Sequence, residues 1–230
     1  MSGWSGAVGG RDDERVNKLV KRFLGRLGRG RPPESIYPEH RCVATEFWCG
    51  EDADADNDFI SNVPSAWCDD WVASFGGVDD PRHRNGYLPA GFTPRENPFY
   101  LALPFADYDE NGVRPGVSRI PWHAGGPGEY PENGSLLKNR WVQVRHRGRT
   151  AYGQWEDVGP NEEDDPDFVF GNAQPKNTFG ERAGIDLSPA LCDYLGLAGS
   201  GQVTWRFVEA ADVPAGPWTE IVTADAPRWE

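Results

Sequence analysis

The chain has 230 residues and a formal net charge of −13, from 23 Lys and Arg residues against 36 Asp and Glu residues. Its length suits one large domain with or without a tail, and 38% hydrophobic residues are too many for wholesale disorder. A body this acidic repels phosphate backbones and anionic lipid, and no apolar run reaches the roughly 18 residues that cross a membrane. We therefore expect neither a nucleic-acid partner nor a membrane span.

Residues 1–35 differ from the rest of the chain in charge. They hold eight bases and four acids, a net charge of +4, which leaves −17 for residues 36–230. Apolar residues within 11–28 recur with a helical period, which predicts an amphipathic helix with a basic opposite face. The Gly-Arg-Gly-Arg-Pro-Pro run at 28–33 ends this helix and is typical of a linker.

We therefore expect a basic tail, helix and linker over 1–35 and one domain over 36–230. The helix either packs on its own acidic domain, lies on an anionic surface, or frays as a tail. The first residues lack the apolar core of a secretory signal peptide, so export is not visible in this chain.

Short strands joined by connections rich in Gly, Pro, Asn and Asp follow from Cys42 onward. The pattern predicts strands at 43–48, 99–103, 141–146, 150–157, 167–170 and 202–209. The run Arg147-Gly148-Arg149 separates two of them and predicts a hairpin. Six short strands favour a small closed or nearly closed barrel, with the turn-rich stretch 50–135 laid over it as loops.

The sequence predicts one helix at 189–195. Ser188 is a typical N-cap, Pro189 suits the first turn, and Gly196 is typical of the residue just past a helix end. We thus expect a mainly β fold with one short helix in its C-terminal half and the amphipathic helix at its N-terminus.

Four cysteines, Cys42, Cys49, Cys68 and Cys192, have no spacing that closes a zinc site. Their even number is compatible with two disulfides in any of three pairings, or with four free buried thiols. The four His residues are scattered, so we expect no metal and no cofactor. The run from Asp107 to Gly112 matches the opening of a calcium loop, but position twelve is Ser118 rather than Glu, which favours a polar hairpin turn.

Two carboxylates stand out by position. In 150–157, strict alternation would put Trp155 and Asp157 on one face, just before the turn Val158-Gly159-Pro160. In 184–188, Ile185 and Leu187 alternate with Asp186, so we expect the acid to point away from the core directly ahead of a helix. Acids at strand ends beside loops are typical of catalytic groups, although capping a helix or tying down a turn is the plainer role.

Three segments, in this order and spacing, resemble the double-psi β-barrel shared by expansins, rare lipoprotein A and glycoside hydrolase family 45. They are WVQVRHRGRTAYGQWEDVGP from residue 141, AGIDLSPALCDYLGL from 183, and VTWRFV from 203. The resemblance is good over about 141–209, thinner at 42–49, and absent before 36 and through most of 50–135. It implies a six-stranded double-psi β-barrel with long loop insertions.

The resemblance also implies site residues. Asp186 matches the general acid, Asp157 a second acid of the groove, and Thr45 a groove threonine. Burial and the charge of Asp157 would raise the pKa of Asp186 toward the range an acid needs. Trp48, Tyr152 and Trp155 are candidates for stacking on sugar rings, with core packing as the alternative for each.

One departure concerns the base. In the family 45 hydrolases an Asp follows the aromatic pair of the first strand, whereas here Cys49 follows Phe47 and Trp48. Only Glu51 and Asp52 lie nearby as substitutes. The resemblance then implies cleavage by a single acid, as in lytic transglycosylases or a related glycosidase, or expansin-like binding and wall loosening without cleavage. We expect a monomer at the cell envelope or secreted, acting on peptidoglycan or β-glucan.

Overall fold

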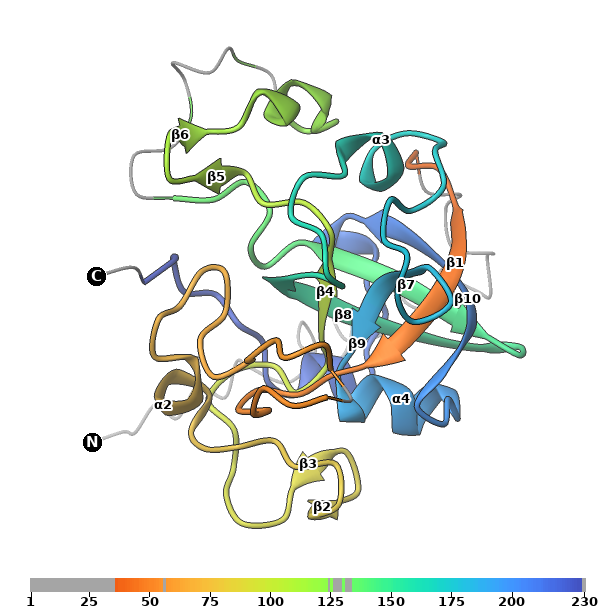
Figure 1. Cartoon of the computed structure of the whole chain (residues 1–230). Coiled ribbons are helices and arrows are strands. Elements are labelled where there is room, and N and C mark those ends of the chain that lie inside the picture. Colours follow the sequence, from red (N-terminus) through yellow and green to blue (C-terminus); the bar gives the residue numbers. More distant parts are fainter. Residues whose placement is uncertain (1–35, 56, 124, 126–129, 131–133, 229–230) are drawn as a thin grey trace, which may run out of the picture. The chain divides into compact units, whose positions relative to one another are not determined.

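The structure is a computed structural model that describes residues 36–228 except 56, 124, 126–129 and 131–133. The predicted amphipathic helix at 11–28 and its linker lie outside the described residues. Figure 1 shows the described part as a barrel with loops and short elements packed around it.

Six strands close the barrel. In order around it they are β1 (His40–Glu46), β10 (Ser200–Val208), β7 (Trp141–His146), β8 (Arg149–Val158), β4 (Tyr100–Leu103) and β9 (Ala183–Leu187). The pairs β1–β9 and β4–β8 are parallel and the other four are antiparallel. The prediction of a closed six-stranded barrel is therefore confirmed.

The hairpin predicted at Arg147-Gly148-Arg149 joins β7 to β8. His146 pairs with Arg149, which leaves Arg147 and Gly148 as the two turn residues, with φ values of 43° and 85°. Two consecutive positive φ values are typical of the type I′ turn, whose twist matches that of antiparallel strands.

The predicted strand at 167–170 is wrong, because this segment is the short helix α3 (Pro166–Val169). Asp165 caps it by accepting a hydrogen bond from the backbone N–H of Phe168, and Pro166 takes the first turn. The sixth strand is instead β9, which brings Asp186 into the barrel wall.

The helix α4 (Pro189–Leu195) is confirmed with its caps. Ser188 Oγ accepts a hydrogen bond from the Leu191 N–H at 3.3 Å, and Gly196 ends the helix in the left-handed conformation with φ 70°. Because Ser188 follows β9 directly, the helix start holds the end of the strand that carries Asp186.

Loops and small elements fill most of the stretch 50–135. They include α2 (Trp71–Phe75), η1 (Pro115–Arg119) and two small hairpins, β2 (Arg84–Asn85) with β3 (Leu88–Pro89) and β5 (Tyr108–Asp109) with β6 (Gly112–Val113). The β5–β6 hairpin is the polar turn predicted in place of a calcium loop. Two 3-10 turns, η3 (Ala210–Asp212) and η4 (Pro217–Thr219), follow β10.

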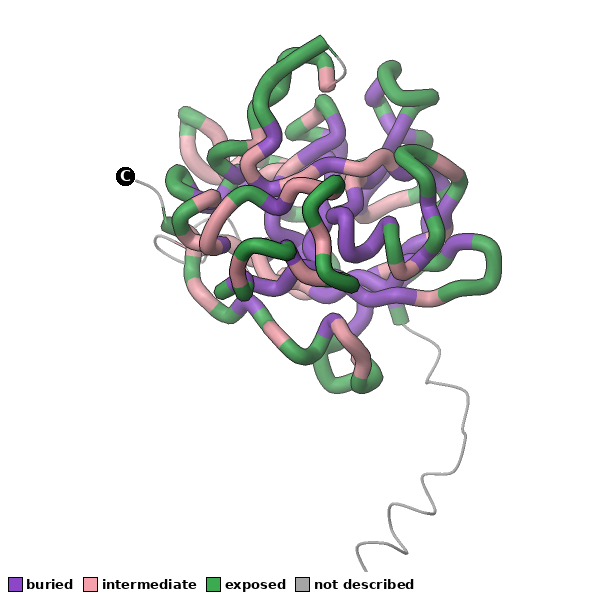
Figure 2. Tube along the Cα trace, turned by 90° about the horizontal axis from the view of Figure 1, so that it is seen from below, coloured by how far each residue is buried: buried purple, intermediate pink, exposed green. Residues whose placement is uncertain are grey.

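The core has two parts, and Figure 2 shows buried residues gathered inside a rim of exposed loops. The barrel interior holds alternate residues of every strand, among them Leu101, Trp155, Ile185 and Phe207. An outer cluster lies on the other side of β4; its buried members are Phe47, Cys49, Cys68, Trp71, Phe75, Tyr100 and Ala102.

All four cysteines are buried, free thiols. Of the alternatives that the sequence left open, the structure has four unpaired thiols rather than two disulfides. Burial raises the pKa of Cys42 to about 12 and that of Cys49 far above its usual range, so both stay neutral thiols.

Candidate active site

The two acids singled out in the sequence share one row across four neighbouring strands. Thr45 of β1 pairs with Asp186 of β9, Asp186 pairs with Ala102 of β4, and Ala102 pairs with Asp157 of β8 (Figure 1). Residues paired in register point to the same face of a sheet, so the row presents both carboxylates on one side. Ala102, with only a methyl group, separates them.

This row faces out of the barrel. Leu101 and Leu103 belong to the barrel interior, whereas Ala102 between them belongs to the outer cluster. Ile185 and Leu187 are likewise fully buried in the barrel, which confirms that Asp186 points the other way. The site therefore lies on the outer wall, beneath the loops that follow β1 and precede β4.

An irregularity in β8 sets the direction of Asp157. Leu101 pairs with Trp155, but the next residue of β4, Ala102, pairs with Asp157, so Glu156 is an extra residue in the ladder. The expectation that Trp155 and Asp157 share a face is therefore wrong. The bulge leaves Trp155 inside the barrel and turns Asp157 outward to the row.

Asp186 is held from both sides. Thr45 Oγ1 donates a hydrogen bond to Asp186 Oδ1, and the position that a Cβ of residue 159 would take lies 3.1 Å from Asp186 Oδ2. Burial, and after it the charges of Asp157 and Glu51, raise the pKa of Asp186 to about 7, while the Thr45 hydrogen bond opposes this shift. A carboxyl with such a pKa carries a proton for part of the time at neutral pH, which is what a general acid requires.

Asp157 is anchored by two backbone donors. Its Oδ1 accepts hydrogen bonds from the N–H groups of Ala66 at 2.7 Å and Val158 at 2.8 Å. Burial raises its pKa to about 7 despite these bonds, and the charge of Glu163 adds to the shift. The tether to a turn that the sequence suggested is thus present, and it also fixes the carboxyl in the row.

Glu51 and Asp52, the two acids expected to substitute for a base at position 49, differ in their position. Glu51 is buried, accepts a hydrogen bond from Asn62 Nδ2 at 2.8 Å, and acts electrostatically on Asp186, whereas Asp52 is exposed. Burial raises the pKa of Glu51. Cys49 is fully buried in the outer cluster and is no base, since a neutral thiol is a very weak proton acceptor.

The predicted stacking residues are not gathered at the row. Trp155 is fully buried and donates its indole N–H to the backbone oxygen of Asp157, and Tyr152 is buried against Trp218. Trp155 lies inside the barrel and Tyr152 on its outer side, and both belong to the same buried cluster, so core packing, the alternative, describes them. Trp48, which directly follows the Phe47 of the outer cluster, is half-buried.

Two exposed rings lie in loops beside the row and were missed by the sequence analysis. Phe179 is 54% exposed and precedes Gly180, whose Cβ would lie 3.3 Å from Thr45 Cγ2. Phe59 is 73% exposed and follows Asp58, which accepts a hydrogen bond from Asn161 at 3.3 Å. Asn161 lies two residues after Gly159, the glycine whose Cβ would approach Asp186. Nothing in the residue pattern alone places these loops at the barrel wall.

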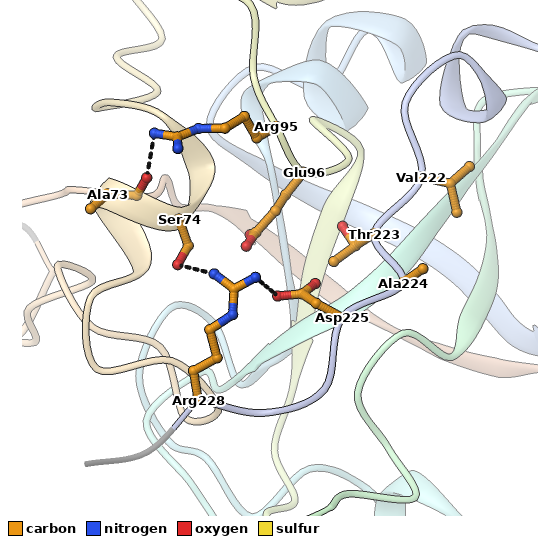
Figure 3. A pocket seen from close by; sticks show the side chains of 9 residues that line it. All are labelled: Ala73, Ser74, Arg95, Glu96, Val222, Thr223, Ala224, Asp225 and Arg228. Atoms are coloured by element: carbon orange, nitrogen blue, oxygen red, sulfur yellow. Dashed lines mark hydrogen bonds and ion pairs between the residues drawn. The ribbon is translucent and has the colours of Figure 1, made fainter.

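A polar cavity of about 430 Å³ lies elsewhere, between α2, the segment before β4 and the C-terminal segment (Figure 3). Arg228 crosses it and binds Asp225 at 3.0 Å and Ser74 at 2.9 Å, while Arg95 binds the backbone oxygen of Ala73. None of the three polar residues of the row lines this cavity.

Within the part of the chain that the structure describes, no group of three or more His, Cys, Asp and Glu side chains is placed to hold a metal ion. No helix among the same residues is long and apolar enough to cross a membrane.

Comparison with known proteins gives little more. No protein-family model matches the chain, and no curated protein is similar to it in sequence. Among solved structures, the Streptomyces papain inhibitor (SPI) is 17% identical, with a TM-score of 0.31, and the match covers 76% of this chain and 100% of that one.

Proposed function

We propose that this protein acts on cell-wall polysaccharide and cleaves a β-linked glycan with Asp186 as the general acid. The observation that supports this most is the row of Thr45, Asp186, Ala102 and Asp157, which sets two carboxyls with pKa values raised to about 7 on one face. The double-psi type of the barrel and a place at the cell envelope or outside the cell belong to the same proposal.

The two acids divide the proton between them. Because the charge of Asp157 raises the pKa of Asp186, ionisation of one carboxyl disfavours ionisation of the other, and the pair holds about one proton near neutral pH. Asp186 is the more accessible of the two and would donate that proton to the glycosidic oxygen. Asp157 would then stand as the carboxylate.

Two endings of the reaction are compatible with this arrangement. Two strand spacings put the Cα atoms of Asp157 and Asp186 about 10 Å apart, and inverting glycosidases hold their carboxyls roughly 6.5–9.5 Å apart with a water between. In hydrolysis, that water would bond to the anomeric carbon and give its proton to Asp157. In lytic transglycosylation, a hydroxyl of the same sugar would take the place of water and leave an anhydro end.

Incubation of the intact protein with peptidoglycan and with β-glucan, followed by mass analysis of soluble products, tests this. Anhydro ends would indicate transglycosylation and reducing ends hydrolysis, and either should disappear in Asp186→Asn. Product formation unchanged in Asp186→Asn would contradict the assignment of the acid.

The alternative is an expansin-like module that binds and loosens glycan without cutting it. The buried, neutral thiol at Cys49 favours it, because the base of the hydrolase relatives is lost at that position. Retention on insoluble glycan without soluble product, unaffected by Asp186→Asn, would support this alternative over cleavage.

A further inference from the structure

A slot of about 360 Å³ opens directly beside Asp157. It is lined by Ala66 and Trp67 from one loop and by 106–109 from the segment that follows β4. The backbone N–H of Ala66 is the group that binds Asp157 Oδ1, so the wall of the slot and the carboxyl are in contact. The slot therefore lies next to the Asp157 end of the row of Thr45, Asp186, Ala102 and Asp157.

The lining suits a ring with one apolar face. Ala66 and Ala106 offer methyl groups, and Tyr108 offers an aromatic ring that is held edge-on by Tyr130 at 5.1 Å between ring centroids. Asp109 adds a half-buried carboxylate that can accept hydrogen bonds from hydroxyls. The volume falls within the range of about 300–1,000 Å³ that small-molecule sites occupy.

The charges around the slot restrict which ligands it can bind. Asp107 is fully buried and already accepts hydrogen bonds from Trp67 Nε1, Tyr130, Ser135 and the Leu136 N–H. Asp109 in the lining and Glu163 beside Asp157 add further negative charge, which Arg114 offsets in part through ion pairs with both. An anionic ring such as a uronic acid would be repelled, whereas a neutral ring would not.

We infer that the slot is a subsite for one neutral sugar ring of the same glycan that Asp186 cleaves, with Tyr108 as its stacking surface. This inference rests on the proposed function. If the slot is a subsite, Ala66, Ala106 and Tyr108 determine how long a glycan the protein prefers and which charge that glycan carries. These residues lie in loops that the resemblance to known barrels does not cover.

Filling the slot tests the subsite. The wild-type protein and the variants Ala106→Phe and Tyr108→Ala would be titrated with neutral β-linked gluco- and chito-oligosaccharides of increasing length and with an oligouronide. The products of each incubation would also be measured. We expect affinity and kcat/KM of the wild type to rise with length, the oligouronide not to bind, and both slot variants to lose about tenfold on the longest neutral chain. Ala211→Phe, on the exposed η3, is the matched control and should keep the rise with length.

The outcomes separate this inference from the proposed function. Cleavage with an unchanged length dependence in both slot variants, at wild-type melting temperature, overturns the subsite and leaves the acid in place. Binding that weakens in the slot variants without any cleavage supports the subsite and overturns the reaction. Tighter binding of the oligouronide than of the neutral chain overturns the charge argument, and no binding of any chain overturns both proposals.

Discussion

Asp157 and Asp186 lie two strands apart on the outer wall of the barrel, each paired in register with Ala102 of the strand between them. Burial raises the pKa of both carboxyls to about 7, and the charge of Asp157 adds to the shift at Asp186. The pair therefore changes its ionisation near neutral pH, where both turnover and stability should respond.

The pH dependence of turnover should follow Asp186. If its protonated form is the acid, kcat/KM falls as the pH rises through about 7, its raised pKa. Asp157→Asn removes a like charge that raises this pKa, so the alkaline limb of the turnover that remains in that variant should move to lower pH. A limb that stays in place would show that the two acids are not coupled.

The Thr45 hydroxyl should shift the alkaline limb of the pH profile in the direction opposite to the charge of Asp157. Its hydrogen bond to Asp186 lowers the pKa of that carboxyl, so Thr45→Val is expected to move the alkaline limb upward by about one pH unit. Thr204→Val, on the half-buried part of β10, is the control and should leave the limb unchanged. A downward shift in Thr45→Val would contradict the assignment.

Gly159 is expected to be required for the geometry of Asp186. Gly159 has a φ of 157°, which residues with a side chain rarely adopt, and a Cβ there would meet Asp186 Oδ2 at 3.1 Å, so Gly159→Ala should shift the backbone or the carboxyl and reduce turnover by about tenfold or more. At Gly86, which also has a positive φ of 61°, nothing lies within 4 Å of such a Cβ, and Gly86→Ala should keep wild-type turnover. Equal turnover in both variants would argue against Asp186 as the acid.

The two acids should also make stability depend on pH. Their pKa values rise from 3.8 to about 7 on folding, so the folded state binds more protons between about pH 4 and pH 7. The free energy of unfolding therefore falls as the pH rises through this window, by at most about 4 kcal/mol for each acid. Replacement by Asn should remove part of this loss.

Denaturant unfolding of Asp157→Asn and Asp186→Asn at pH 4 and pH 8 measures this effect. Each variant should gain stability relative to wild type at pH 8 and little at pH 4. Asp212→Asn, at an exposed position of η3, should show no such difference. Buried His40 acts in the opposite direction. Burial lowers its pKa to about 4, so below about pH 6.5 the unfolded chain binds a proton that the folded state does not, and the free energy of unfolding falls with the pH.

Much of the barrel was predictable because local rules and tertiary packing agree there. The hairpin at Arg147 and Gly148 and the helix end at Gly196 depend on positive φ values, and the helix start at Ser188 depends on its side-chain cap; each was located from sequence. The strand predicted at 167–170 was wrong because its apolar residues suit a strand, whereas the Asp165 cap and Pro166 favour a helix.

The site was predictable only in part. Alternation located Asp186 on the outer face, since β9 is regular there, but it misplaced Trp155 relative to Asp157, because the bulge at Glu156 arises from pairing with β4. A bulge is a property of two strands and is not encoded in one of them. The positions of Phe59, Phe179 and the slot at Tyr108 likewise depend on how long loops pack on the barrel.

Cys49 gives the last prediction, because it follows the aromatic pair Phe47 and Trp48, the position at which the resemblance led us to expect a base. The thiol is fully buried among the aromatic rings of the outer cluster, so a carboxylate placed there would lose its hydration without gaining a partner. Cys49→Asp is therefore expected to lower the free energy of unfolding by several kcal/mol and to add no hydrolytic turnover, whereas Cys49→Ala should cost roughly 1–2 kcal/mol. Thermal melts and product analysis of both variants measure this. A folded Cys49→Asp protein that releases reducing ends faster than wild type would show that the base position faces the substrate, and that the neighbouring loop opens in solution.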